Sequence, residues 1–330
     1  MPDDETTSSA RSKWNYHPEL PLTDQSIFVW PPRPGFLARW FAKNWLALSE
    51  RVILLLIALA AWAWLYPDLE ESRTFALGWI FQIWVVNMGL MIAGVGGLHW
   101  YFYMRRGQGK TLKFDHRNPA TGSRTYSFRD QVHDNMFWSL ISGVGFWTAF
   151  QALMQWGMAN GYFPTIEFFE NPIWFLALFV LIPIWSAFHF YWIHRLLHVP
   201  FMYKRFHALH HRNVNVGPWS GLSMHPVEHL LYFSSVLIHA AVASHPVHLI
   251  NHLIYQTLGA AMTHTGYENL LIKDKRRLAL GTFYHQLHHR FFECNYGNQE
   301  MPWDRWFGTF HDGTDERARE IRQRKKQMHA

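Results

Sequence analysis

The chain has 330 residues, of which 49% are hydrophobic, 17% aromatic and only 16% charged. This composition excludes a disordered chain, and soluble domains carry about 25% charged residues, so the deficit indicates a membrane-embedded protein. Cys294 is the only cysteine, which excludes a disulfide scaffold, and we expect it to be a packed, unreactive thiol. The net charge of +6 comes from basic residues that flank apolar runs, so no nucleic acid partner is expected.

The N-terminal segment is polar from Met1 to Ser12 and ends in a proline-rich stretch, residues 30–35. It lacks the basic start, apolar run and small-residue cleavage site of a signal peptide. We therefore expect residues 1–44 to form a cytosolic arm that is disordered or lies on the surface.

Four apolar stretches within residues 45–193 are interpreted as membrane-spanning helices. They are Val52–Tyr66, which Trp45–Leu48 could extend, Phe75–Tyr103, Phe137–Met158 and Ile173–Ile193. Lysine and arginine are concentrated before the first stretch and after the second and fourth, whereas residues 159–172 contain none. By the positive-inside rule, both termini and everything after residue 193 are expected in the cytosol.

Residues 230–243 and 247–262 are also apolar, but each is shorter than a comfortable span, and Pro246 lies between them. A re-entrant hairpin or a bent pair of helices at about 230–262 is predicted. The expected fold class is therefore all-α: an integral membrane bundle of about four transmembrane helices plus this hairpin, with a cytosolic helical cap. Residues 194–312 form the histidine-rich region with the hairpin, and the basic tail 313–330 is interpreted as a solvated helix.

The 22 histidines nearly equal the 24 acidic residues, and three segments concentrate them as one HxxxH and two HxxHH patterns. On a helix, positions i, i+3 and i+4 share a face, so each segment is expected to present its imidazoles toward one point. The eight histidines are His194, His198, His207, His210, His211, His285, His288 and His289. One metal ion takes about four to six ligands, so this set predicts two metals close together.

Further polar residues lie near these clusters. His264 follows the hairpin, which could return it to the third cluster, so we predict it as a ninth ligand, with Glu268 as a ligand or the partner of one. His225 and His229 are read equally well as ligands or as packed side chains, and Glu228 between them as a capping or locally paired residue. His248 and His252 have helical spacing within the apolar hairpin, so spacing alone does not identify a ligand.

The region from Phe188 to Phe310 resembles the fatty acid hydroxylase and sterol desaturase superfamily of integral membrane di-iron oxygenases. Residues 194–198, 207–211 and 285–289 look like its three histidine boxes, and residues 295–297 and 303–310 are similar to its usual ending. Residues 225–228 resemble a segment of its sterol-acting branches. Some fatty acid 2-hydroxylase relatives have a second HxxxH before the last box, whereas Glu268 stands four residues after His264 here. This departure favours sterol-type over acyl substrates.

The resemblance implies two iron ions held by the nine histidines, O2 as co-substrate, and oxidation of an unactivated C–H bond of a membrane lipid. Asp304 joins His225, His229 and Glu268 as a further candidate ligand or partner of a ligand. No reductase motif is present, so electrons are expected from a cytochrome b5, a ferredoxin or a flavoprotein reductase that docks on the basic cytosolic face. The host membrane would be the endoplasmic reticulum in a eukaryote or the inner membrane in a bacterium.

Other functions remain open from the residues. A fatty acyl hydroxylase of the same superfamily, a membrane metal-binding or transport protein, and a structural protein with surface histidines are the alternatives. Transport is disfavoured because the clusters follow the spans and no span carries a chain of ionisable residues. Hydroxylation and desaturation begin with the same hydrogen abstraction, so the pattern is compatible with either.

Overall fold

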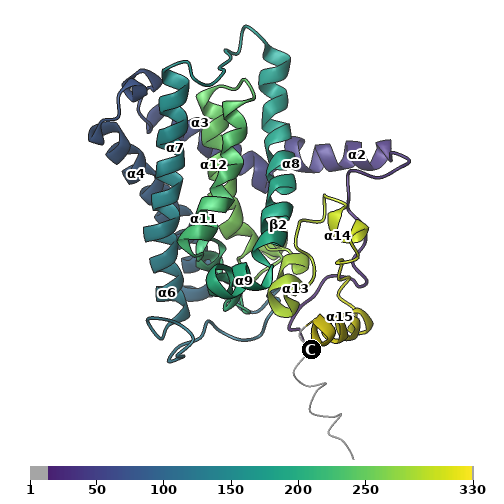
Figure 1. Cartoon of the computed structure of the whole chain (residues 1–330). Coiled ribbons are helices and arrows are strands. Elements are labelled where there is room, and N and C mark those ends of the chain that lie inside the picture. The colour runs from purple at the N-terminus through teal and green to yellow at the C-terminus, as the bar shows by residue number, and fades with distance from the viewer. Residues whose placement is uncertain (1–13, 329–330) are drawn as a thin grey trace, which may run out of the picture.

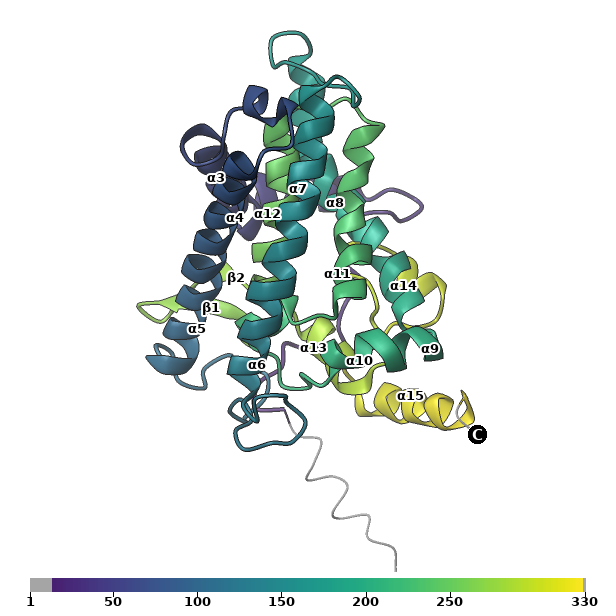
Figure 2. The same ribbon diagram turned by 60° about the vertical axis from the view of Figure 1, so that its left-hand side comes forward.

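The computed structural model describes residues 14–328, and its long helices stand side by side (Figure 1). Four helical segments in this part of the chain are long and apolar enough to cross a membrane: Pro34–Trp64, Leu77–Met104, Gln131–Ala159 and Pro172–Leu197. The all-helical membrane class and the four predicted spans are thereby confirmed. The histidine-rich segments gather at one end of the bundle, around α9, α10 and α13, whose bounds are given below (Figure 2).

The first of these segments is bent. It consists of α2 (Pro34–Phe41), a π-helical turn (Ala42–Leu46) and α3 (Glu50–Trp64). Figure 1 shows α2 lying crosswise to the long helices. The Ser49 side chain accepts a hydrogen bond from the backbone N–H of Val52 and so caps α3, which fixes where the upright helix begins. Residues 34–44 of the expected arm are therefore helical, whereas Met1–Ser12 lie outside the described residues.

The other three spans are single helices or helices continued through π-helical turns. The second contains α4 (Leu77–Met91), a π turn (Ile92–Gly96), α5 (Gly97–His99) and a π turn (Trp100–Met104). The third contains α6 (Gln131–Phe137), a π turn (Trp138–Gly143) and α7 (Val144–Ala159). The fourth is α8 (Pro172–Leu197), which starts where Asn171 accepts a hydrogen bond from the N–H of Trp174.

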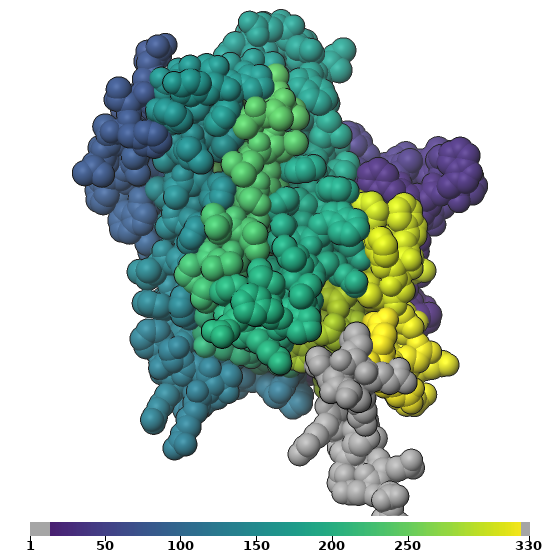
Figure 3. Space-filling model, viewed as in Figure 1, coloured from purple at the N-terminus to yellow at the C-terminus, as the bar shows by residue number. Residues whose placement is uncertain are grey.

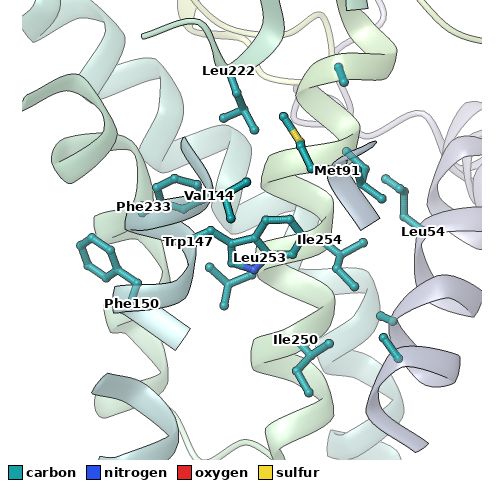
Figure 4. Packing of buried hydrophobic residues seen from close by; sticks show 14 of the residues in the cluster. Leu54, Met91, Val144, Trp147, Phe150, Leu222, Phe233, Ile250, Leu253 and Ile254 are labelled. Atoms are coloured by element: carbon teal, nitrogen blue, oxygen red, sulfur yellow. The ribbon is translucent and has the colours of Figure 1, made fainter. Parts of the chain in front are cut away.

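The apolar hairpin is a bent pair of helices, as predicted. It consists of α11 (Pro226–Phe233), a 3-10 helix (Ser234–Ala240) and α12 (Pro246–Thr263). Helix α12 packs against α3, α7 and α8 and lies at the centre of the bundle. Figure 4 shows the Trp147 ring of α7 beside Leu253 and Ile254 of α12, all of them fully buried. The hairpin therefore forms the core of the protein.

Short elements build the end that carries the histidines. They are α9 (Pro200–Met202), a π turn (Tyr203–His207), α10 (Ala208–His211), a 3-10 helix (Pro218–Leu222), β1 (Asn269–Ile272), β2 (Lys275–Ala279), α13 (Phe283–Phe291), α14 (Trp303–Trp306) and α15 (Asp315–Met328). The antiparallel pair β1–β2 was not predicted. Its turn residues Lys273 and Asp274 both have positive φ, as a two-residue hairpin turn requires.

The N-terminal and C-terminal parts of the chain lie together on one side of the molecule (Figure 3). The backbone N–H of Leu22 donates to the carbonyl of Asp312 at 2.8 Å, and that of Ile27 donates to the carbonyl of Glu300 at 3.0 Å. The basic tail forms a helix as predicted, but α15 buries Ala318 and Ile321 against the protein. It is therefore a docked helix with one solvated face.

Gly221 allows the 3-10 helix Pro218–Leu222 to approach α12 closely, because a Cβ atom there would lie 2.6 Å from the carbonyl oxygen of Ala260. We expect Gly221→Ala to lower the free energy of unfolding by about 1–3 kcal/mol through overpacking. Denaturation of the purified protein in detergent measures this. Gly89→Ala in α4 is the matched control, since no atom lies within 4 Å of its Cβ position. Equal stability of the two variants would contradict the close approach.

Candidate metal centre

Four segments bring histidines to the same end of the bundle. His194 and His198 lie on or just after the last turn of α8, which ends shortly before Pro200. The 207–211 cluster spans the end of a π turn and α10, and the 285–289 cluster lies on α13. Thr282 caps α13 by accepting a hydrogen bond from the N–H of His285 at 3.2 Å. His264 ends α12, so the core helix delivers it to the same place.

The structure brings all nine predicted histidines together in two groups, and within each group the ligand nitrogens lie within 4.8 Å of one another. The first group is His194, His198, His207, His211 and His288, and the second is His210, His264, His285 and His289. Adjacent residues on a helix point about 100° apart. Each HxxHH segment therefore serves both groups, and the expectation that a segment faces a single point was wrong.

Hydrogen bonds fix which nitrogen of several rings carries the proton. The Nδ1 atoms of His194, His264 and His288 lie 2.6, 2.7 and 2.6 Å from the carbonyl oxygens of Tyr296, Ala260 and Cys294. A carbonyl oxygen only accepts, so each Nδ1 must donate, and in a neutral ring Nε2 then has no proton. These three rings present bare Nε2 lone pairs.

The Nε2 atoms nevertheless lie in contact with one another. His194 and His207 are 3.1 Å apart, His211 and His288 3.0 Å, and His264 and His285 2.9 Å, each measured between Nε2 atoms. Two imidazole nitrogens bound at right angles to one metal at about 2.1 Å would be separated by about 3 Å. His194, His264 and His288 each bring one bare Nε2 to such a contact, so a cation placed there would be bound by both rings of the pair, and the donor set fits one metal ion per group.

Burial keeps these rings neutral. It lowers the pKa of His207 to about 3 and that of His264 to about 4, because burial disfavours the charged, protonated ring. The pKa values of the remaining rings outside the spans are also lowered well below the usual value by burial first, and then by neighbouring histidines: His198, His210, His211, His285, His288 and His289. Neutral imidazole is the form that binds metals.

Glu228 is a site residue whose role the sequence did not reveal. Its Oε1 atom lies 2.7 Å from Nδ1 of His207, and both side chains are buried. Burial raises the pKa of Glu228 well above its usual range and lowers that of His207 to about 3, and a metal cation bound at the His207 ring would favour the ionised carboxylate. A carboxylate that accepts from Nδ1 orients a metal-binding ring. The expected local capping role belongs instead to His225, whose Nδ1 accepts from the N–H of Val227.

The other candidate residues lie outside both groups. His229 contacts the Ser142 hydroxyl and the Leu222 carbonyl, and Glu268 accepts hydrogen bonds from Tyr16 and Arg276. Asp304 supports the site through the backbone, because its carboxylate accepts from the N–H groups of Tyr296 and Gly297. Asp304 thereby holds the loop in place. The Tyr296 carbonyl of this loop accepts the hydrogen bond that His194 Nδ1 donates.

A cavity of about 300 Å³ borders both groups. The histidines that line it are His194 and His207 of the first group and His210, His264 and His285 of the second. Its walls continue along α8 through Ala187, Phe190 and Leu197 and along α12 through Gly259 and Ala260. A mostly apolar cavity with a few polar groups is typical of a small-molecule site. A lipid held here would lie against both polyhistidine groups.

A bundle with four candidate spans and two polyhistidine groups beside an apolar cavity defines an integral membrane metalloprotein. Comparison with known proteins is consistent with this class. Residues 179–309 match the sequence model of the fatty acid hydroxylase family. No solved structure matches the chain.

Curated relatives are sterol desaturases by name. A Delta(7)-sterol-C5(6)-desaturase of Nicotiana tabacum is 26% identical over 269 residues, which cover 77% of this chain and 92% of the relative. A Delta(7)-sterol 5(6)-desaturase of Gibberella zeae is 32% identical over 140 residues, but these cover only 42% of that relative. A second desaturase of the same fungus is 23% identical over 312 residues, covering 93% of this chain and 74% of the relative.

The match of residues 179–309 to the family model and the named desaturase relatives support the fatty acid hydroxylase and sterol desaturase superfamily for this chain. The family assignment made from the histidine clusters is confirmed. All nine histidines lie within the matched region. Membership identifies the chain as an oxidoreductase of an iron-dependent family.

The two groups predict two separable metal sites. We expect wild-type protein to carry two metal ions, and His264→Ala, which removes one of the four ligands of the second group, to carry about one. Elemental analysis of purified protein gives the ratio. His133→Ala is the control, because His133 is exposed and far from both groups in the chain. Wild type with a single ion, or an unchanged ratio in His264→Ala, would contradict two sites.

Acid should release the metal. The lowered pKa values mean that folded, neutral rings bind fewer protons than unfolded ones between pH 6.5 and about 4. Their contribution to stability is present above pH 6.5 and is lost as the pH falls through this window. We expect metal content and melting temperature to fall together below pH 6.5, measured after buffer exchange. Full metal retention at pH 4 would argue against imidazole ligands.

Proposed function

We propose that this protein is a membrane-bound di-iron, O2-dependent lipid oxidase of the sterol desaturase type, which oxidises an unactivated C–H bond of a sterol or related lipid. The observation that supports this most directly is that the histidine Nε2 atoms converge about 3 Å apart in two groups that face one cavity, with His194, His264 and His288 held in the tautomer that leaves Nε2 bare. Relatives named Delta(7)-sterol desaturases support a sterol-type substrate.

The residues of the chain hold, orient and isolate the reactants. The nine histidines would bind the irons, and the carbonyls of Ala260, Cys294 and Tyr296 keep three of the rings in the metal-binding tautomer. When bound, the two irons would activate dioxygen and supply the oxidant that removes hydrogen from the lipid. The walls of α8 and α12 would position the substrate carbon and exclude water from that oxidant.

The exposed surface of the bundle fits a lipid environment. Large apolar side chains that face outward include Phe81, Trp84 and Leu176, which lie on α4 and α8. Basic residues near the histidines, by the positive-inside rule, support a multi-pass protein with its site on the cytosolic face.

Electrons would come from a separate protein, such as a cytochrome b5, a ferredoxin or a flavoprotein reductase. Lys204 and Arg205 are exposed on the π turn that carries His207. Arg195 lies 4.7 Å over the ring of Tyr296, and that ring lies 4.8 Å from His198, both measured to ring centroids. An acidic electron donor docked on these basic residues would be separated from the first histidine group by a single aromatic ring.

The proposal is tested in a sterol-supplemented host that supplies a reductase, fed with heavy-isotope oxygen gas. Wild type is compared with His288→Ala, which removes a ligand of the first group, and with His133→Ala, which does not. We expect an oxidised sterol-type lipid in wild type and His133→Ala only. A labelled alcohol identifies a hydroxylase, and an unlabelled product lighter by two hydrogens identifies a desaturase.

Two results would contradict parts of this proposal. An oxidised fatty acyl chain in place of a sterol would assign the acyl hydroxylase function. Identical lipids in wild type and His288→Ala, with a reductase and sterols demonstrably present, would contradict an oxidase.

A further inference from the structure

The wall of the cavity contains a second polar cluster that does not belong to the metal centre. Glu50 and Arg51 at the start of α3 line the cavity together with Tyr255 of α12 and Glu300 of the loop after α13. Charged side chains at membrane depth are costly and usually functional. Neither Glu50 nor Arg51 lies within the matched family region, so the metal chemistry does not account for them.

The Arg51 guanidinium is held in place by an ion pair, but one of its nitrogens has no hydrogen-bond acceptor in the described part of the chain. Its Nη2 donates to Glu300 Oε2 at 2.5 Å, and its guanidinium lies 5.0 Å over the Trp40 ring. Glu300 in turn accepts from Trp40 Nε1 through its other oxygen, at 2.8 Å. The Arg51 side chain is only 8% exposed, and its Nη1 has no hydrogen-bond partner in the described part of the chain. A buried guanidinium donor without an acceptor is expected to bind one from a ligand.

Glu50 offers the complementary group. Its carboxylate lines the cavity and accepts no hydrogen bond from residues 14–328. Gly259 of α12 leaves room for it, because a Cβ atom there would lie 3.2 Å from Glu50 Oε1. The cavity thus holds an unpaired acceptor, Glu50, beside an unpaired donor, Arg51 Nη1.

We propose that Glu50 and Arg51 bind the hydroxyl group of a neutral lipid alcohol, an inference that rests on the proposed lipid oxidase function and names its substrate class. A hydroxyl both donates and accepts, so it satisfies Glu50 and Arg51 Nη1 together. A fatty acid carboxylate offers acceptors only, so it could pair with Arg51 Nη1 but would leave Glu50 without a donor. The cluster therefore selects an alcohol over an acid.

The position of the cluster also restricts which carbon reacts. Glu50 faces Gly259, and His264 follows five residues later on the same helix, about 7.5 Å along its axis. A hydroxyl bound at Glu50 thus holds the alcohol end of the lipid near the histidines. The oxidised carbon lies close to that end, and the tail extends along the apolar walls.

Binding of two probes tests the inference: a Delta(7)-sterol with its free 3-hydroxyl, and the corresponding 3-ketone, which accepts but cannot donate. We expect full-length wild type to bind the alcohol about tenfold more tightly, the effect of one hydrogen bond to a charged group. Glu50→Leu should bind both probes equally. Glu70→Leu, which alters an exposed carboxylate, should keep the wild-type preference.

Metal content and melting temperature confirm that each variant is folded. If Glu50→Leu does not fold, Glu50→Gln replaces it and should reduce the preference, since an uncharged amide oxygen is a weaker acceptor. A preference that persists undiminished in the folded variant, or tighter binding of a long-chain fatty acid than of the alcohol by wild type, overturns the inference.

Lipid oxidation by the iron-loaded enzyme is measured separately. Oxidised product without any preference for the alcohol overturns this inference and leaves the proposed function standing. Alcohol-specific binding that depends on Glu50, without any oxidised product, supports the inference and counts against the proposed function.

Discussion

The rest of the structure depends on one requirement: imidazole Nε2 atoms must be held about 3 Å apart, and several of them must carry no proton. The protein meets it by giving Nδ1 of several rings an acceptor. These acceptors lie at the end of α12, where the Ala260 carbonyl accepts from the His264 ring as well as from the His264 backbone N–H, and in the loop after α13. The proton of each such ring is thereby fixed on the side away from the shared centre.

The helix bundle supplies the rigidity that this arrangement needs. Helices α8 and α12 run side by side through the core, and each ends in a ligand candidate, His194 and His198 for α8 and His264 for α12. The same two helices form the walls of the cavity. The position of a substrate relative to the metal groups is therefore set by the packing of two buried helices. Other elements also approach α12 closely: a Cβ atom at Gly221 would lie 2.6 Å from the carbonyl oxygen of Ala260, and one at Gly259 would lie 3.2 Å from Glu50 Oε1 of α3.

The sequence predicted the parts of the protein that obey local periodicity. Apolar runs located the four spans, the i, i+3, i+4 spacing of histidines identified eight of the nine residues that come together, and the position of His264 after the hairpin gave the ninth. Spacing did not show that His210 and His211 face different groups, because that depends on the angle between adjacent side chains and on the other helices. The role of Glu228 was missed for a related reason: its partner His207 lies 21 positions away in the chain.

Other features lay beyond sequence reasoning because they involve the backbone or tertiary docking. No side-chain pattern marks Cys294 or Tyr296 as hydrogen-bond acceptors, because it is their backbone carbonyls that accept from the histidine rings. The short pair β1–β2 carries basic residues that resemble a surface loop. The docking of α15 depends on two buried residues, Ala318 and Ile321, within a highly charged segment.

The cavity is lined by two parts of the chain, one inside the region that matches the family model and one outside it. Every histidine of the two groups lies within residues 179–309, the region that matches the family model. The opposite wall comes partly from α3, which that region does not include. Glu300 links the two, because it lies four residues after Tyr296 and pairs with Arg51. The loop that accepts the hydrogen bond of His194 Nδ1 at Tyr296 therefore also supplies the ion-pair partner of Arg51, so one loop contributes to both walls of the cavity.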